Sequence, residues 1–259
     1  MSLNYIYIHL DTISNSLFSR GLNIHDFSSS VFDIPENILL LDPHENDGEY
    51  EPHTGLRVIR GQNQVLRYFF QKSKQRESEV KWIDFKDINL IQQLTPMEIA
   101  ELLYFGHMSS QLHSPFFYKL QNNFVYFEKP DDLTKVFYRR MDDFYKIISA
   151  KLENIVFDKI NHKKGLFKKP MTVSKIEFEK IKVLKTAFQE GLVLDVRQAG
   201  TKEENYIIPL YVVEDRIRNI SDRDLREENR VGQIVYSTSS MLWTIEVTDT
   251  WLAQGALKV

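Results

Sequence analysis

Acidic residues and histidines alternate in one short stretch of this chain, between positions 42 and 55. Imidazole and carboxylate groups are ligands for Zn²⁺, Mn²⁺ or Ca²⁺ when a loop folds around the ion. The spacing lacks the regular carboxylate ladder and the central Gly of an EF-hand, so we favour a solvated acidic loop and retain His44 and His53 as candidate metal ligands. The polar residues of the stretch are Asp42, His44, Glu45, Asp47, Glu49, Glu51 and His53.

His9 and Asp11 form a second polar pair, at the end of a strand predicted over residues 3–10. Residues two apart on a strand share a face, so this pair could hold a metal or act as an acid and base. The interpretation we favour is a partly buried histidine with Asp11 capping the next turn. A metal-dependent hydrolase is the alternative, and it requires His9 and Asp11 to meet the loop from 44 to 53 in one pocket.

Motifs that identify an enzyme class are absent from the sequence. It contains no GxSxG elbow, no GxxxxGK phosphate loop, no GxGxxG and no HExxH. The absence of Cys excludes disulfides, thiol catalysis and thiolate metal sites. Whether the chain is an enzyme stays open, and no cofactor is predicted.

An aromatic-rich stretch at residues 115–139 predicts a three-stranded antiparallel meander. Asn122 and Asn123 tolerate the positive φ of a two-residue hairpin loop, and Pro130 suits a second turn. Loops of these lengths determine which residues are opposite each other. The resulting register pairs Lys119 with Tyr126, Val125 with Val136, and Phe127 with Thr134.

The two faces of this predicted meander differ in composition. One face is apolar and is the expected core face. The other mixes aromatic rings with basic groups, a composition on which planar ligands or bases can stack. We favour a structural interpretation in which a helix covers this second face and at least three of its four rings are buried. The candidate ligand-binding residues of the second face are Phe117, Lys119, Phe124, Tyr126, Lys135, Phe137 and Arg139.

The helix predicted to begin at Thr95 has the clearest start signal. Thr95 can cap the free amides, Pro follows in the first turn, and Glu98 can reach back to the cap. We expect Leu103 to lie in the core with Ile99 and Leu102, and Gly106 to end the helix.

Other elements follow from periodicity and from capping patterns. A long helix is predicted from Asp142, and a second capping box at Ser174 starts a helix that stops at Gly191. Strands are predicted at 80–85 and 192–197, and a closing hairpin at 233–248.

These elements run in local groups without βαβ alternation, which indicates an α+β fold with antiparallel, aromatic-rich sheets packed with helices. A chain of 259 residues that is 42% hydrophobic can bury a sizeable core. The basic segment KINHKKGLFKKP, with a Gly and a terminal Pro, is the candidate linker. The expected regions are 1–158 with the meander at 115–139, a basic loop or linker at 159–172, and 173–259.

Composition also bears on location and partners. No apolar run approaches the length of about 20 residues needed to cross a bilayer, and no export signal begins the chain. We therefore expect a soluble, cytoplasmic protein with no membrane partner. The favoured role is non-catalytic binding of an unidentified protein or small ligand. Nucleic-acid binding, through the second meander face and the basic segment 159–169, is a further alternative.

Overall fold

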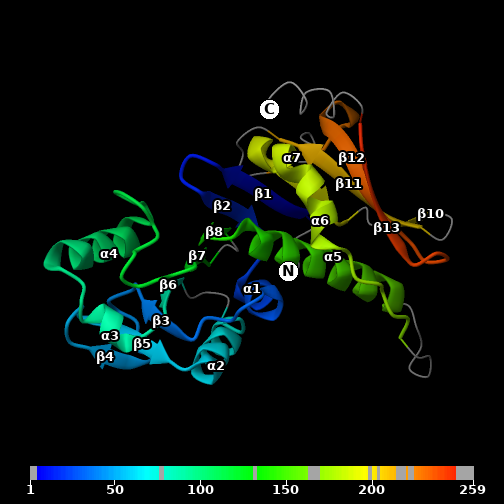
Figure 1. Cartoon of the computed structure of the whole chain (residues 1–259). Helices are drawn as coiled ribbons and strands as arrows, with labels where there is room; N and C mark the ends of the chain where they lie inside the picture. Colours follow the sequence, from blue (N-terminus) through cyan, green and yellow to red (C-terminus); the bar gives the residue numbers. More distant parts are fainter. Residues whose placement is uncertain are drawn as a thin grey trace. The chain divides into compact units, whose positions relative to one another are not determined.

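A computed structural model describes residues 5–75, 79–130, 133–162, 170–197, 200–202, 205–213, 220 and 225–248. Helices and antiparallel strands are both present, which confirms the predicted α+β class (Figure 1). The chain divides into a middle unit of residues 13–18 and 22–144 and a terminal unit of residues 1–12, 19–21 and 145–259. None of the helices in the described ranges is long and apolar enough to cross a membrane.

The strands and helices carry the labels of Figure 1. In the middle unit they are α1 (Ile24–Ser30), β3 (Asn37–Leu40), β4 (Glu49–Glu51), β5 (Leu56–Arg60), α2 (Gln62–Lys72), β6 (Val80–Phe85), α3 (Ile88–Ile91), α4 (Pro96–Met108), β7 (Phe124–Lys129) and β8 (Leu133–Tyr138). In the terminal unit they are β1 (Tyr5–Asp11), α6 (Phe178–Ile181), η1 (Lys182–Leu184), α7 (Lys185–Glu190), β9 (Leu192–Asp195), β10 (Gly200–Lys202), β11 (Asn205–Val212), η2 (Glu227–Asn229), β12 (Arg230–Ser237) and β13 (Leu242–Val247). The division between the units falls within β2 (Ser16–Arg20) and α5 (Met141–Asn161).

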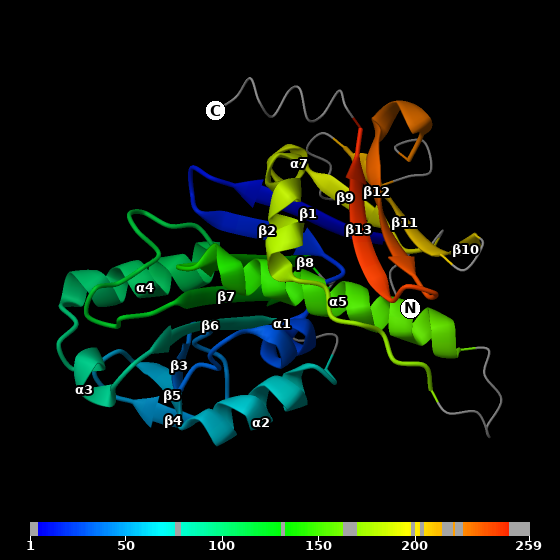
Figure 2. The same cartoon turned by 45° about the vertical axis from the view of Figure 1, so that its right-hand side comes forward.

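The middle unit is built on an antiparallel sheet in the order β8-β7-β6-β3-β5-β4 (Figure 2). Because side chains alternate along a strand, Leu39, Ile83 and Val125 point to one face of this sheet. These residues form a buried cluster with Leu102 and Phe105 of α4 and with side chains of α3. Helices α3 and α4 therefore cover this first face.

Aromatic rings dominate the opposite face of the same sheet. Phe27 of α1 contacts four other rings at centroid distances of 5.1 to 6.1 Å, and Trp82 stacks on Tyr126 at 5.3 Å. All five rings are fully buried. We call this group the ring cluster: Phe27, Phe69, Trp82, Phe124 and Tyr126.

The prediction that residues 116–121 form the first strand of a meander was wrong, because this segment is a turn. The reason is Asn122, which is fully buried rather than placed in an exposed hairpin loop. Its Oδ1 accepts from the Phe117 amide at 2.8 Å, and its Nδ2 donates to the Pro115 carbonyl at 3.1 Å. These bonds fold 115–122 back on itself, and β6 takes the place beside β7 that the predicted strand was expected to occupy.

The predicted register between the second and third strands was also wrong, by one residue. Tyr126 is opposite Val136 and Val125 is opposite Phe137, because three residues rather than two separate the paired ends of β7 and β8. A slip of one residue exchanges the faces of every side chain on a strand. Phe137 therefore shares a face with Val125 and not with Tyr126.

Helix α4 begins as the sequence predicts. The Thr95 hydroxyl accepts from the Glu98 amide, and the Glu98 carboxylate accepts from the Thr95 amide at 2.7 Å. The prediction of a buried Leu103 was wrong, since its side chain is 38% exposed. Gly106 does not end the helix either. A Cβ on Gly106 would lie 2.4 Å from the Leu41 carbonyl oxygen, so this glycine lets α4 approach β3 closely.

The terminal unit holds the strands β13-β12-β11-β9-β1 of the sheet, in that order, with β10 beside β11. The predicted closing hairpin is confirmed, because β12 pairs with β13 over six residue pairs. The first strand, β1, pairs with β9, so the start of the chain groups with its C-terminal part. Residues 163–169 of the predicted basic linker lie outside the described residues.

Helix α5, which is divided between the two units, follows its predicted stripe. In α5, Phe144, Ile147 and Leu152 are buried as expected. The second predicted capping box was wrong. The Ser174 hydroxyl donates to the Met241 carbonyl at 2.6 Å, and α6 starts only at Phe178.

Candidate functional site

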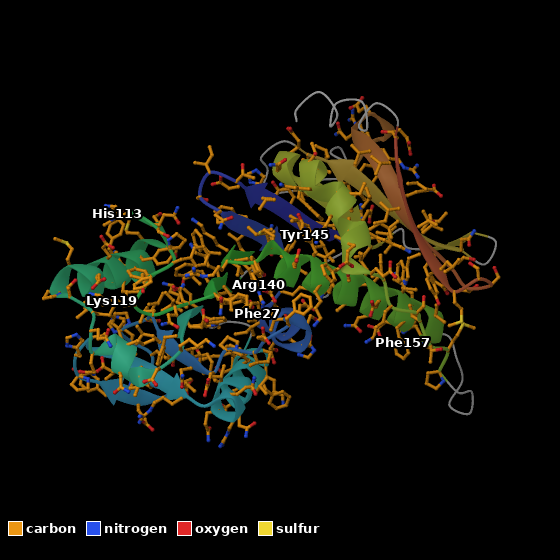
Figure 3. The ribbon with its side chains drawn as sticks, viewed as in Figure 1. Phe27, His113, Lys119, Arg140, Tyr145 and Phe157 are labelled. Atoms are coloured by element: carbon orange, nitrogen blue, oxygen red, sulfur yellow. The ribbon has the colours of Figure 1, made fainter. Side chains whose placement is uncertain are left out.

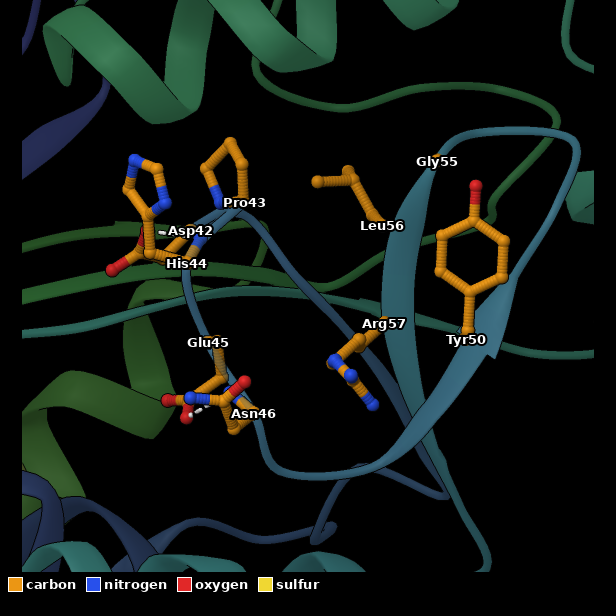
Figure 4. Close-up of a pocket in the computed structure, with 9 residues that line it drawn as sticks. All are labelled: Asp42, Pro43, His44, Glu45, Asn46, Tyr50, Gly55, Leu56 and Arg57. Atoms are coloured by element: carbon orange, nitrogen blue, oxygen red, sulfur yellow. Dashed lines mark hydrogen bonds between the residues drawn. The ribbon is translucent and has the colours of Figure 1, made fainter.

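The predicted acidic loop lines an open pocket of about 490 Å³ in the middle unit (Figure 4). Asp42, His44 and Glu45 come from the loop after β3, and Tyr50 and Arg57 come from the β4–β5 pair. The Asp42 carboxylate accepts from the His44 backbone amide at 2.9 Å, and the Arg57 guanidinium donates to the Gly48 carbonyl. These bonds stabilise the loop itself.

Glu45 forms an ion pair with a lysine at the end of α2. The Lys72 ammonium lies 2.7 Å from Glu45 and 3.2 Å from Asp47, and its side chain is only 7% exposed. Burial opposes the charge on Glu45, but the Lys72 hydrogen bond and nearby backbone amides outweigh it and hold the pKa of Glu45 below its ordinary value. A largely buried ion pair between Glu45 and Lys72 therefore holds the acidic loop to α2.

Glu51 and His53 have structural partners as well. Glu51 is buried and accepts from the Thr54 amide at 2.8 Å, the Thr54 hydroxyl at 2.7 Å and the Gln92 side chain at 2.7 Å. Burial raises the pKa of Glu51, but the Thr54 bonds outweigh it and leave the pKa below its ordinary value. The His53 Nε2 atom lies 2.8 Å from the Leu94 carbonyl oxygen. Both side chains hold the turn after β4 against α3 and its C-terminal end.

The four candidate metal ligands do not come from one unit. His9 and Asp11 are half-buried residues of β1 in the terminal unit, whereas His44 and His53 belong to the middle unit. Within the described ranges, no three His, Cys, Asp or Glu side chains are grouped so as to hold a metal ion.

The candidate ligand-binding rings are mostly inside the protein. Phe124, Tyr126 and Phe137 are at most 1% exposed, and Phe117 is partly buried, which confirms that at least three of the four rings are covered. They do not share one face, because Phe137 packs on Phe105 beneath α4 while Phe124 and Tyr126 belong to the ring cluster.

The basic members of that set also have partners. The Lys119 ammonium lies 2.7 Å from Glu98, and the Lys135 ammonium donates to the Ser109 carbonyl at 3.2 Å. Arg139 donates through Nε to the Asn122 carbonyl at 2.7 Å, and its guanidinium lies 4.9 Å from the Phe116 ring centre. The seven residues are therefore distributed over separate contacts rather than one open platform.

A buried carboxylate that sequence reasoning missed is Asp84, next to the last residue of the apolar strand β6. Its oxygens accept from the Asn123 amide at 2.9 Å and the Phe124 amide at 2.6 Å. Burial raises the pKa of Asp84 to about 7, against the opposing effect of these amides and of Arg139. An acidic residue within VKWIDF was the available signal. Its hydrogen bonds to Asn123 and Phe124 hold the turn before β7 to the end of β6.

The outer face of α4 exposes several large apolar side chains. Met97 is 71% exposed, Met108 52%, and Leu103 and Tyr104 38% each, with Leu112 just beyond the helix at 58%. The opposite side of the helix carries the buried Leu102 and Phe105. We call this set of five residues the outer face of α4: Met97, Leu103, Tyr104, Met108 and Leu112.

Two basic side chains beside α4, His113 and Lys119, are labelled in Figure 3. The sequence has no Lys or Arg between Lys86 and Lys119. Lys119 is paired with Glu98, and the Nδ1 atom of the exposed His113 lies 2.8 Å from the Glu101 carboxylate. The face thus combines apolar side chains with a rim of paired charges.

Comparison with known proteins identifies no relative. No family model matches the chain, and no curated protein or solved structure matches it.

Proposed function

We propose that this protein is a non-catalytic protein-binding module and that the outer face of α4 is its docking surface. The observation that carries the proposal is the exposure of Met97, Tyr104 and Met108 on a helix whose other side is already packed in the core. Large contiguous apolar patches on folded proteins mark interaction sites, because leaving them in water costs about 25 cal/mol per Å².

The composition of the face favours a protein over other macromolecules. Phosphates and anionic lipid surfaces attract Lys and Arg, and residues 87–118 contain neither. Methionine side chains are unbranched and polarizable, so Met97 and Met108 can adapt to an apolar partner surface. Tyr104 adds a ring with a polar tip, a residue type enriched at protein interfaces.

The test is site-specific photo-cross-linking in the cells that make the protein. A photoreactive side chain replaces Tyr104 in one variant and Phe70 in the control, since Phe70 is also apolar and 59% exposed but lies on α2. We expect a discrete cross-linked protein from position 104 and none from position 70. Equal cross-linking from both positions, or none from position 104, would contradict the proposal.

A further inference from the structure

We propose, on the basis of the binding function proposed above, that the occupant of the outer face of α4 is a second copy of this chain, packed antiparallel through α4. A stripe along the helix consists of Met97, Tyr104 and Met108 of this face together with Glu101, whose side chain is 22% exposed. These residues follow one another at intervals of four, three and four positions, so the stripe has the same spacing in both directions along the helix.

A symmetric spacing has a direct consequence for two-fold pairing. In a two-fold contact the same patch serves on both copies, and residue i meets residue j while j meets i. An axis through the midpoint of the stripe places Met97 opposite Met108 of the second copy. The same axis places Glu101 opposite Tyr104 of the second copy. Thioether meets thioether at both ends, and a carboxylate meets a phenol hydroxyl that can donate to it.

Charge also suits a second copy. No Lys or Arg would be buried on either side, because residues 87–118 contain neither. Glu98 keeps its bond to Lys119 at the rim, and Glu101 keeps its contact with His113. A basic partner helix would instead need acidic groups free to receive it, and both glutamates of α4 already have partners.

The available area suits a weak dimer. At about 200 Å² for a fully exposed large side chain, the five residues of the outer face expose roughly 500 Å² per copy. Two copies together then approach about 1,000 Å², the lower limit for a specific interface. We therefore expect dimerisation with a dissociation constant on the order of 10–100 μM.

The first measurement is sedimentation of the whole protein from about 5 to 500 μM, a range that brackets the expected constant. We expect the mean mass to rise from monomer toward dimer. The dissociation constant of the dimer should change less than about threefold when the salt concentration is raised, because no opposite charges meet across the contact. Met108→Lys should abolish the rise, whereas the control Phe70→Lys should leave it intact. Far-UV circular dichroism and thermal unfolding confirm that both variants are folded.

The second measurement tests the antiparallel register and uses the absence of natural cysteines. Met97→Cys and Met108→Cys chains are mixed and oxidised mildly. We expect the mixture to form a disulfide-linked dimer and Met97→Cys alone to form little. In the antiparallel pair the two copies of position 97 are about 16 Å apart along the helix axis, beyond the reach of a disulfide.

The outcomes separate this inference from the binding function on which it rests. A mass that stays monomeric, or cross-linking no stronger than that of a Phe70→Cys control, overturns the second copy. If position 104 then still cross-links to a different protein in cells, the binding function stands and the second copy does not. If the protein neither dimerises nor cross-links to another protein, and instead binds neutral lipid vesicles in a way that depends on Met108, the face is a membrane contact and both proposals fail.

Discussion

The ring cluster and the outer face of α4 are both rich in large apolar side chains, yet among the described residues only the ring cluster is covered by other elements. Phe27 is enclosed by four rings from α2, β6 and β7, whereas Met97 and Met108 face solvent. Apolar composition by itself therefore does not distinguish a core from a docking surface. The two regions differ in whether other described residues pack against their apolar side chains, and substitutions can measure this difference.

The largest effect is expected at the centre of the ring cluster. Phe27→Ala removes the ring that touches all four others, and it should lower the free energy of unfolding by about 3 to 5 kcal/mol, since a buried aromatic leaves a large cavity. Urea denaturation measures the change. Met97→Ala on the outer face should lower the free energy of unfolding by less than about 0.5 kcal/mol. A comparable loss in both variants would show that the two regions do not differ in burial.

Adjacent leucines on α4 give a matched pair. Leu102 is fully buried and Leu103 is 38% exposed, so Leu102→Ala should cost about 2 to 5 kcal/mol and Leu103→Ala less than about 1 kcal/mol. Denaturant midpoints at low protein concentration compare the two. A larger loss for Leu103→Ala would mean that the helix is rotated so that Leu103, and not Leu102, faces the sheet.

Asp84 gives the ring-cluster side of the sheet a pH dependence. Its pKa is about 7 in the folded protein and near 3.8 in an unfolded chain, so the folded state holds the proton more tightly. The unfolded state therefore loses the proton first, and stability should fall by a few kcal/mol, on the order of 2 to 4, as pH rises from about 4 to 7. Urea midpoints across this range measure it. In Asp84→Asn the fall should be absent, and an unchanged pH profile would show that Asp84 is not its source.

The smallest expected effect tests the close approach of α4 to β3. Alanine is a better helix former than glycine by about 1 kcal/mol, yet Gly106→Ala should destabilise by about 1 to 3 kcal/mol because its Cβ would meet the Leu41 backbone. Thermal unfolding measures the change. A stabilised variant would show that α4 can move away from the sheet.

Local signals predicted several elements correctly because their causes are local. Thr95, Pro96 and Glu98 lie within four residues, and their bonds form inside one helical turn. The long helix after Asp142 and the β12–β13 hairpin were predicted for the same reason. Helix α1 was not predicted, although Asn23 and Asp26 form a capping box in front of it.

The α+β class, the main helices and the hairpins of the terminal unit were thus determined by the sequence alone. Only the tertiary structure decided that Asn122 is buried and that β6 pairs with β7, because both depend on packing against other segments. The shift of β8 by one residue depends instead on the number of residues between the paired ends of β7 and β8, which the turn signal at Pro130 did not determine. The candidate site follows the same division. Periodicity predicts a buried stripe of Ile99, Leu102 and Leu103 on α4, but which side lies on the sheet depends on how closely Gly106 lets the helix approach β3.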